Sequence, residues 1–135
     1  MMIIEHVAIW TRNLEALRTY YQTYFGAVPN DKYTNERKGF QSYFLSFSNG
    51  TRLELMSKEG IPENRNDTIE TQHLGLIHIA FGVDTMKEVD QKAEELRQAG
   101  FSILNGPRKT GDGYYEFETL DPDNNRLEVT TLFIE

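Results

Sequence analysis

Two histidines and two glutamates recur at matching places in the chain, and together they have the chemistry of a metal site. His6 opens the segment HVAIWTRNLEAL, and His78 opens the similar segment HIAFGVDTMKEV. Glu54 lies in RLEL, and Glu128 lies in the similar RLEV. Imidazole and carboxylate groups suit zinc, nickel, cobalt, manganese and ferrous iron. The chain has no cysteine, so thiolate metal sites, disulfides and cysteine nucleophiles are excluded.

The apolar residues around these four positions predict that all four lie on one face of a sheet. Successive side chains of a β-strand point to opposite faces. The flanking positions of opposite parity are apolar, so we expect them to pack against helices. Two imidazoles and two carboxylates on the other face, shielded from water, call for a cation between them. The apolar positions are Val7, Ile9, Leu53, Leu55, Ile77, Ile79, Phe81, Leu127 and Val129.

The alternative for each residue is ordinary. A histidine on a strand is more often a surface or hydrogen-bonded residue than a ligand, and a glutamate on a strand is usually solvated. The same residue types at the same repeat position, twice over, favour the metal site.

The internal repeat predicts a single α+β domain over residues 1–135, built from two βαβββ modules. The modules span residues 1–57 and 73–135, and a polar linker spans 58–72. We expect a curved mixed sheet, a cup or half-barrel, with the helices outside. One helix should end at Gly26, and the other should start from a Thr85–Glu88 capping box and stop at Gly100. The expected strands are residues 3–10, 28–34, 39–48, 51–57, 76–83, 101–105, 112–120 and 126–133.

Composition excludes several kinds of partner. The net charge of −7 disfavours nucleic acid and anionic membranes as partners, because nucleic-acid binding depends on clustered Lys and Arg. No apolar run approaches the roughly 20 residues that span a membrane. The start MMIIEH lacks the basic region of a signal peptide, so we expect a cytoplasmic protein. The small size of the modules favours a homodimer.

Other side chains on the same face are candidates for binding a substrate. Trp10 and Met56 share the parity of His6 and Glu54, so they line a pocket or simply fill the core. Arg52 and Arg126 precede the two glutamates by two positions, and either bind an acidic substrate group or pair with a local carboxylate.

A glycine-rich segment, residues 106–115, combines basic and aromatic residues. It is either a mobile loop over the cup or a plain hairpin turn. As a loop it would offer Arg108 or Lys109 to an anion and Tyr114 for stacking.

The segments HVAIW, RLELMS, HIAF and DPDNNRLEV resemble the vicinal oxygen chelate superfamily, and the resemblance covers essentially the whole chain. That superfamily includes glyoxalase I, extradiol dioxygenases, methylmalonyl-CoA epimerase and antibiotic-resistance proteins. The order His-Glu-His-Glu is most similar to glyoxalase I. The resemblance implies that His6, Glu54, His78 and Glu128 are ligands of one divalent ion, with Zn or Ni favoured over Co, Mn or Fe.

The same resemblance implies a lyase or isomerase that transfers a proton next to a carbonyl through a metal-bound enediolate. Glu128 is the first choice for the base, and Glu54 is the second. Trp10 and Lys58 stand where bacterial glyoxalase I has the Arg and Asn that contact glutathione, so the glutathione adduct is not the expected substrate. The alternatives are a non-catalytic small-molecule binding or resistance protein, and a dioxygenase, which Glu54 disfavours.

Overall fold

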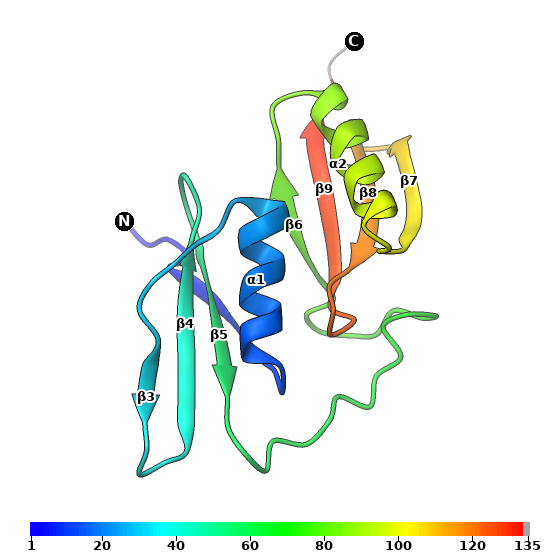
Figure 1. Cartoon of the computed structure of the whole chain (residues 1–135). Coiled ribbons are helices and arrows are strands. Elements are labelled where there is room, and N and C mark those ends of the chain that lie inside the picture. The colour runs from blue at the N-terminus through cyan, green and yellow to red at the C-terminus, as the bar shows by residue number, and fades with distance from the viewer. Residues whose placement is uncertain (134–135) are drawn as a thin grey trace. The chain divides into compact units, whose positions relative to one another are not determined.

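The chain has an α+β fold, as the sequence predicts, in a computed structural model that describes residues 1–133 (Figure 1). It divides into two compact units, Met1–Asn64 and Arg65–Glu135. Each unit contains one mixed β-sheet and one helix. The sheets are open, and the order of elements along the chain is similar in the two units.

The sheet of the first unit has the strand order β1-β5-β4-β2, and β3 pairs with β4. Strand β1 runs parallel to β5, and the other pairings are antiparallel. Helix α1 packs on β5, β4 and β2. The elements are β1 His6–Trp10, α1 Leu14–Phe25, β2 Val28–Pro29, β3 Tyr33–Asn35, β4 Phe40–Ser46 and β5 Arg52–Ser57.

The expected strand at residues 28–34 is two short strands, because side-chain hydrogen bonding interrupts the ladder at Asn30. The amide N–H of Asn30 donates to the carbonyl of Phe44 at 3.0 Å, and its side-chain oxygen accepts from the N–H of Phe44 at 2.9 Å. The side chain thus takes a hydrogen bond that a backbone carbonyl would take in a continuous strand. The first unit therefore has five strands instead of the four expected.

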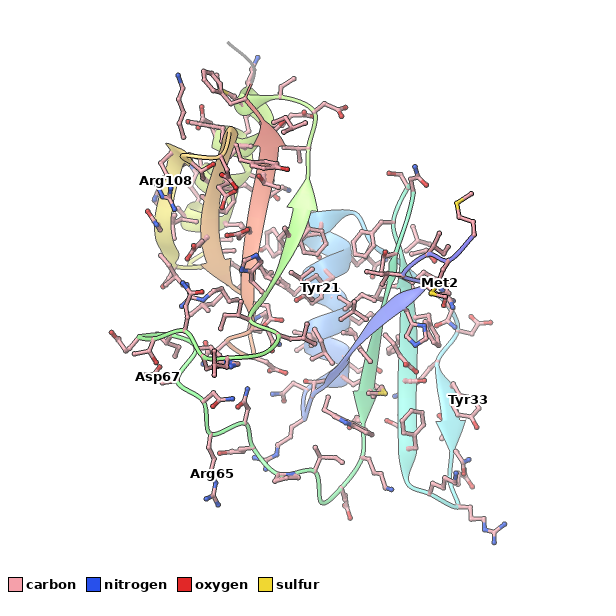
Figure 2. All side chains as sticks on the ribbon, turned by 180° about the vertical axis from the view of Figure 1, so that it is seen from behind. Met2, Tyr21, Tyr33, Arg65, Asp67 and Arg108 are labelled. Atoms are coloured by element: carbon pink, nitrogen blue, oxygen red, sulfur yellow. The ribbon has the colours of Figure 1, made fainter. Side chains whose placement is uncertain are left out.

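Helix α1 forms because its apolar residues recur at helical spacing, which places them on one face that packs against the sheet. Leu14, Leu17 and Tyr21 are buried against it. Figure 2 shows Tyr21 on this helix. Gly26 ends the helix in the left-handed conformation (φ 67°) that glycine adopts without strain, as the sequence predicts.

The sheet of the second unit has the order β6-β9-β8-β7, with β6 parallel to β9 and the rest antiparallel. Helix α2 packs on β7, β8 and β9 through Val89, Ala93 and Leu96. The elements are β6 His78–Gly82, α2 Met86–Gln98, β7 Ile103–Lys109, β8 Tyr114–Leu120 and β9 Arg126–Leu132.

The capping box that the sequence predicts for α2 is present. The hydroxyl of Thr85 accepts from the N–H of Glu88, and the Glu88 carboxylate accepts from the N–H of Thr85. The helix ends at Gln98, with Ala99 as its C-cap, just before the expected stop at Gly100.

Strand β7 extends beyond the expected residues 101–105, and segment 106–115 is a hairpin. Arg108 and Lys109 lie in β7, and Tyr114 begins β8. The N–H of Thr110 donates to the carbonyl of Tyr114 at 2.7 Å and closes the turn. Of the two interpretations left open by the sequence, the structure has the hairpin.

Among residues 1–133, no helix is long and apolar enough to cross a membrane.

Candidate functional site

The first unit brings His6 and Glu54 together on one face of its sheet. In the parallel register His6 lies beside Arg52, and Ala8 lies beside Glu54. Nε2 of His6 is 3.7 Å from Oε1 of Glu54. The Glu54 side chain is only 16% exposed. Its neighbours Leu53 and Leu55 point the opposite way and are buried, as strand alternation requires.

The second unit repeats this arrangement with His78 and Glu128. The register is the same, with His78 beside Arg126 and Ala80 beside Glu128. Nε2 of His78 is 3.1 Å from Oε1 of Glu128, whose side chain is 12% exposed. In both units, therefore, it is Nε2 of the histidine that faces a largely buried carboxylate.

The structure brings together two pairs, one in each unit. Across residues 1–133 there is no group of three or more His, Asp or Glu side chains placed to hold a metal ion. Of the four ligands expected from the sequence, His6 lies with Glu54 in the first unit, and His78 lies with Glu128 in the second.

Around the second pair, carboxylates are crowded. Glu118 of β8 lies opposite Glu128 of β9 in the antiparallel register. Glu116 also lies on β8, two residues before Glu118. Burial, followed by hydrogen bonding with Glu116 and repulsion from Glu116 and Glu118, raises the pKa of Glu128 to about 7. Arg108 acts in the opposite direction with a smaller effect. The ionised form of Glu128 thus lacks enough positive charge nearby.

This charge imbalance is the observation that tests whether a cation fits. A carboxylate whose charge is poorly compensated is stabilised by a divalent ion. Each unit presents one imidazole nitrogen and one carboxylate oxygen close together, and these are donor types that Zn²⁺ and Ni²⁺ accept. The chemistry of each pair, taken by itself, therefore fits a divalent ion.

Around the first pair, the charges are balanced differently. Glu5 accepts a hydrogen bond from Nδ1 of His6 at 2.9 Å. Arg52 donates to Glu5 through Nε at 3.0 Å and Nη2 at 2.5 Å, and its guanidinium carbon lies 4.1 Å from the centre of the Phe44 ring. The Phe44 ring also meets the His6 ring edge-on, with centroids 5.3 Å apart.

The two arginines that precede the glutamates both pair with local carboxylates. Arg52 binds Glu5, and Arg126 donates through Nη1 to Glu118 at 2.7 Å. Arg126 is buried and also donates through Nη2 to the carbonyl of Thr68 at 2.6 Å. Of the two interpretations of these arginines, the structure favours pairing within the chain.

Trp10 and Met56 lie side by side on the same face as His6 and Glu54. They are register partners between β1 and β5. Trp10 remains 43% exposed and meets the Phe40 ring edge-on, at 6.0 Å between centroids. Phe40 in turn contacts Tyr33, which lies on β3 (Figure 2). We call Trp10, Tyr33 and Phe40 the aromatic patch.

The three candidates of segment 106–115 have different surroundings. Arg108, labelled in Figure 2, is the register partner of Glu116 and influences Glu128 electrostatically. The Nζ of Lys109 lies 3.8 Å from the centre of the Phe133 ring. Tyr114 is partly exposed at the first position of β8. Of these three residues, Arg108 is the one with an electrostatic interaction with a His-Glu pair, through Glu128.

The sequence interpretation missed Glu5, Glu116 and Glu118, as well as Tyr33 and Phe40. The alternation in YYEFETL holds a signal for the two glutamates of β8, since Phe117 and Thr119 are buried against the helix. Glu5 was missed because the expected strand at residues 3–10 puts it on the face opposite His6, whereas β1 begins at His6 and the Glu5 side chain contacts the His6 ring.

The chain is similar in sequence to a known protein family and to a bacterial protein. A family model described as Glyoxalase/Bleomycin resistance protein/Dioxygenase superfamily matches residues 3–129. The uncharacterized protein YqjT of Bacillus subtilis is 25% identical over 133 residues, which cover 93% of this chain and 96% of that protein.

Solved structures with similar folds come from several organisms. The trypanothione-dependent glyoxalase I of Leishmania major has a TM-score of 0.76 and 20% identity, with 97% of this chain and 87% of that chain covered. A glyoxalase/bleomycin resistance protein/dioxygenase domain from Frankia has a TM-score of 0.81 and 19% identity, with 98% and 93% covered. A glyoxalase family protein from Enterococcus faecalis has a TM-score of 0.74 and 25% identity, with 94% and 95% covered.

Proposed function

Since the chain belongs to the glyoxalase/bleomycin resistance protein/dioxygenase superfamily, we propose that it is a metal-dependent lyase or isomerase. It moves a proton next to a carbonyl of a small substrate. The observation that carries the proposal is the duplicated pair, in which Nε2 of a histidine faces a largely buried carboxylate in each unit.

The proposed ligands of the ion are His6, Glu54, His78 and Glu128. Zn²⁺ and Ni²⁺ are the first candidates, and Co²⁺, Mn²⁺ and Fe²⁺ follow. When bound, the ion would stabilise negative charge that develops on a substrate oxygen. The two pairs are supplied by one chain or by two chains of a homodimer, and the stoichiometry of metal per chain and per dimer is part of the test.

Glu128 is the proposed general base. In the metal-free protein burial and the neighbouring glutamates raise its pKa to about 7, and these surroundings favour proton uptake by a carboxylate that loosens from the ion. Glu116, which is hydrogen-bonded to Glu128, is placed to share the proton while it resides on the protein. Glu54 is the second choice, because it occupies the same repeat position but has Phe44 opposite it instead of a carboxylate.

The proposed substrate contacts are Trp10, Met56 and Arg108, with Lys109 and Tyr114 secondary. Trp10 offers an exposed ring for a planar or apolar part of the substrate. Arg108 offers a cation to an acidic substrate group. Because Trp10 and Lys58 occupy the positions that contact glutathione in bacterial glyoxalase I, the proposed substrate is not the glutathione adduct.

A binding or resistance protein is the second candidate, and the aromatic patch favours it. The exposed rings of Trp10 and Tyr33, both in contact with the half-buried Phe40, are suited to holding an apolar small molecule without chemistry. Such a protein would keep its ligand affinity after removal of metal.

The deciding experiment starts from protein purified without added metal and analysed for bound elements. The apo protein is then reconstituted with Zn²⁺, Ni²⁺, Co²⁺ or Mn²⁺ and assayed on α-hydroxycarbonyl thiol adducts and acyl-CoA compounds, with proton exchange into ²H₂O followed by NMR. Metal-dependent exchange supports the proposal. Failure of every metal to bind would overturn it and favour the binding protein.

The cellular setting is also part of the proposal. We propose a homodimer in the cytoplasm, acting on a small molecule and not on nucleic acid or a membrane, in keeping with the net charge of −7. Sedimentation analysis of the apo and metal-loaded protein tests the dimer.

A further inference from the structure

The His6 ring is held from the side opposite Glu54. Its Nδ1 lies 2.9 Å from Oε1 of Glu5, while its Nε2 faces Glu54. Glu5 immediately precedes β1, and its side chain contacts the ring of the next residue. This contact has no counterpart in the repeat pattern of the sequence.

Glu5 is itself fixed by the neighbouring strand. The two hydrogen bonds from Arg52 hold both oxygens of its carboxylate. Its carbonyl accepts from the N–H of Arg52 at 2.9 Å, and the hydroxyl of Thr51 donates to the carbonyl of Ile4 at 2.9 Å. The backbone and the side chain of Glu5 are thus both tied to the segment that enters β5. Paired, charge-assisted bonds of this kind give geometric specificity.

The acceptor determines which ring nitrogen carries hydrogen. An ionised carboxylate only accepts hydrogen bonds, so the Nδ1 that it contacts must be the N–H nitrogen. In the neutral ring the lone pair then lies on Nε2, the nitrogen that faces Glu54. The guanidinium of Arg52 donates to both oxygens of Glu5, and such a paired arrangement is typical of an ionised carboxylate.

We propose that Glu5 is a positioning residue that holds His6 in the Nδ1–H tautomer and presents Nε2 to the metal ion. The tautomer of His6 is inferred from the hydrogen bonds alone, and the presentation of Nε2 to a metal ion rests on the proposed function. A carboxylate that fixes the tautomer of a ligand histidine also raises its basicity, and loss of such a partner typically costs 10- to 100-fold in metal affinity.

The second unit lacks this arrangement. Ile77 stands at the position that matches Glu5, and Arg126, the counterpart of Arg52, binds Glu118 and Thr68 instead. Within residues 1–133, no carboxylate is hydrogen-bonded to Nδ1 of His78. The two histidines are therefore inequivalent, because a carboxylate contacts Nδ1 in His6 and Nε2 in His78.

The test reads the tautomer directly, in metal-free full-length protein. Long-range ¹H–¹⁵N correlation spectra are recorded well above the ordinary histidine pKa of about 6.5. We expect the Nδ1–H form for His6 in the wild type and in Glu5→Gln, whose amide oxygen still accepts from Nδ1. In Glu5→Ala we expect a shift to a mixture rich in the Nε2–H form. Retention of the Nδ1–H form in Glu5→Ala would overturn the proposal.

Two controls show whether the change is specific. His73, whose Nδ1 lies 3.0 Å from the carbonyl of Leu74, should keep its tautomer in every variant. Glu36→Ala removes an exposed carboxylate from a turn of the same unit and should leave His6 unchanged. Backbone amide spectra of each variant confirm that the sheet remains folded.

Zinc affinity, measured by competition with a chromophoric chelator, tests the second half. We expect Glu5→Ala to bind Zn²⁺ 10- to 100-fold more weakly than the wild type, and Glu36→Ala to bind like the wild type. Equal affinity in Glu5→Ala and the wild type would overturn the presentation of Nε2 to the ion. If the wild type binds no metal while the tautomer shifts as expected, the metal proposal fails and the positioning of His6 by Glu5 stands.

Discussion

Nε2 of His78 lies 3.1 Å from Oε1 of Glu128, and Glu128 is the carboxyl group whose pKa rises to about 7. The imidazole of His78 does not prevent this rise in pKa, because Glu128 is buried and both Glu116 and Glu118 of β8 repel its negative charge. The pair is therefore suited to exchange a proton near neutral pH, or to accept a cation.

Replacing Glu128 with Gln should remove the proposed base while keeping the size and shape of the side chain. We expect turnover to fall by about 10²- to 10⁴-fold, which is the usual contribution of a general base. The measurement is steady-state kinetics on whichever substrate the metal-dependent screen identifies. Glu94→Gln, on the exposed face of α2, is the matched control and should keep full activity. Full activity in Glu128→Gln would contradict the assignment.

The stability of the metal-free protein should fall as pH rises between about 4.5 and about 7. The pKa of Glu128 is raised in the folded state, from 4.5 to about 7. Below 4.5 the group is protonated in both the folded and the unfolded state, so it has no effect. As pH rises through this window, the unfolded state loses the proton first and is favoured. Urea unfolding at several pH values measures the effect.

The matched variant for that experiment is Glu128→Gln, in which this component of the pH dependence should disappear. Saturating Zn²⁺ should flatten the wild-type curve, because the ion stabilises the ionised carboxylate. The same slope in the wild type and in Glu128→Gln would mean that another group is responsible.

Glu15 should act in the opposite direction at acid pH. Its hydrogen bonds to Lys32 and then to Tyr43 lower its pKa from the ordinary 4.5. A lowered pKa stabilises the fold above 4.5, and that stability is lost as pH falls toward the folded-state pKa. We expect Glu15→Gln to be less stable than the wild type at pH 7 and to lose less stability on acidification. Thermal unfolding at neutral and acid pH measures both, and parallel pH profiles for the two proteins would refute the prediction.

Gly106 should not tolerate a side chain. Its φ is 91°, and a Cβ there would lie 2.6 Å from the carbonyl oxygen of Glu116. We expect Gly106→Ala to cost about 2 kcal/mol or more, from the strained backbone and the close contact. Gly111→Ala is the control, since no atom lies within 4 Å of a Cβ at that position and its φ is not left-handed. Chemical denaturation compares the two, and equal stability would contradict the steric argument.

The sequence determined the repeat, the helices and the face of each sheet on which the proposed ligands lie. These follow from local rules. Alternation along RLEL and RLEV places Glu54 and Glu128 on the face opposite their buried leucine and valine neighbours. The capping box of Thr85 and Glu88 marks the start of α2 from residues that are close in sequence. Asn30 departs from the pattern because its side chain replaces a backbone acceptor, and the apolar pattern does not reveal that competition.

Only the tertiary structure decided the charge around each pair. Glu118 meets Glu128 because β8 and β9 pair in a particular antiparallel register, and Arg52 reaches Glu5 because β5 returns beside β1. Register is a property of two strands that are distant in sequence, and electrostatic energy depends on the distances that register sets. The residue types of the two repeats therefore match in the sequence, while their surroundings differ in the fold, with His6 held by Glu5 and His78 beside the crowded carboxylate of Glu128.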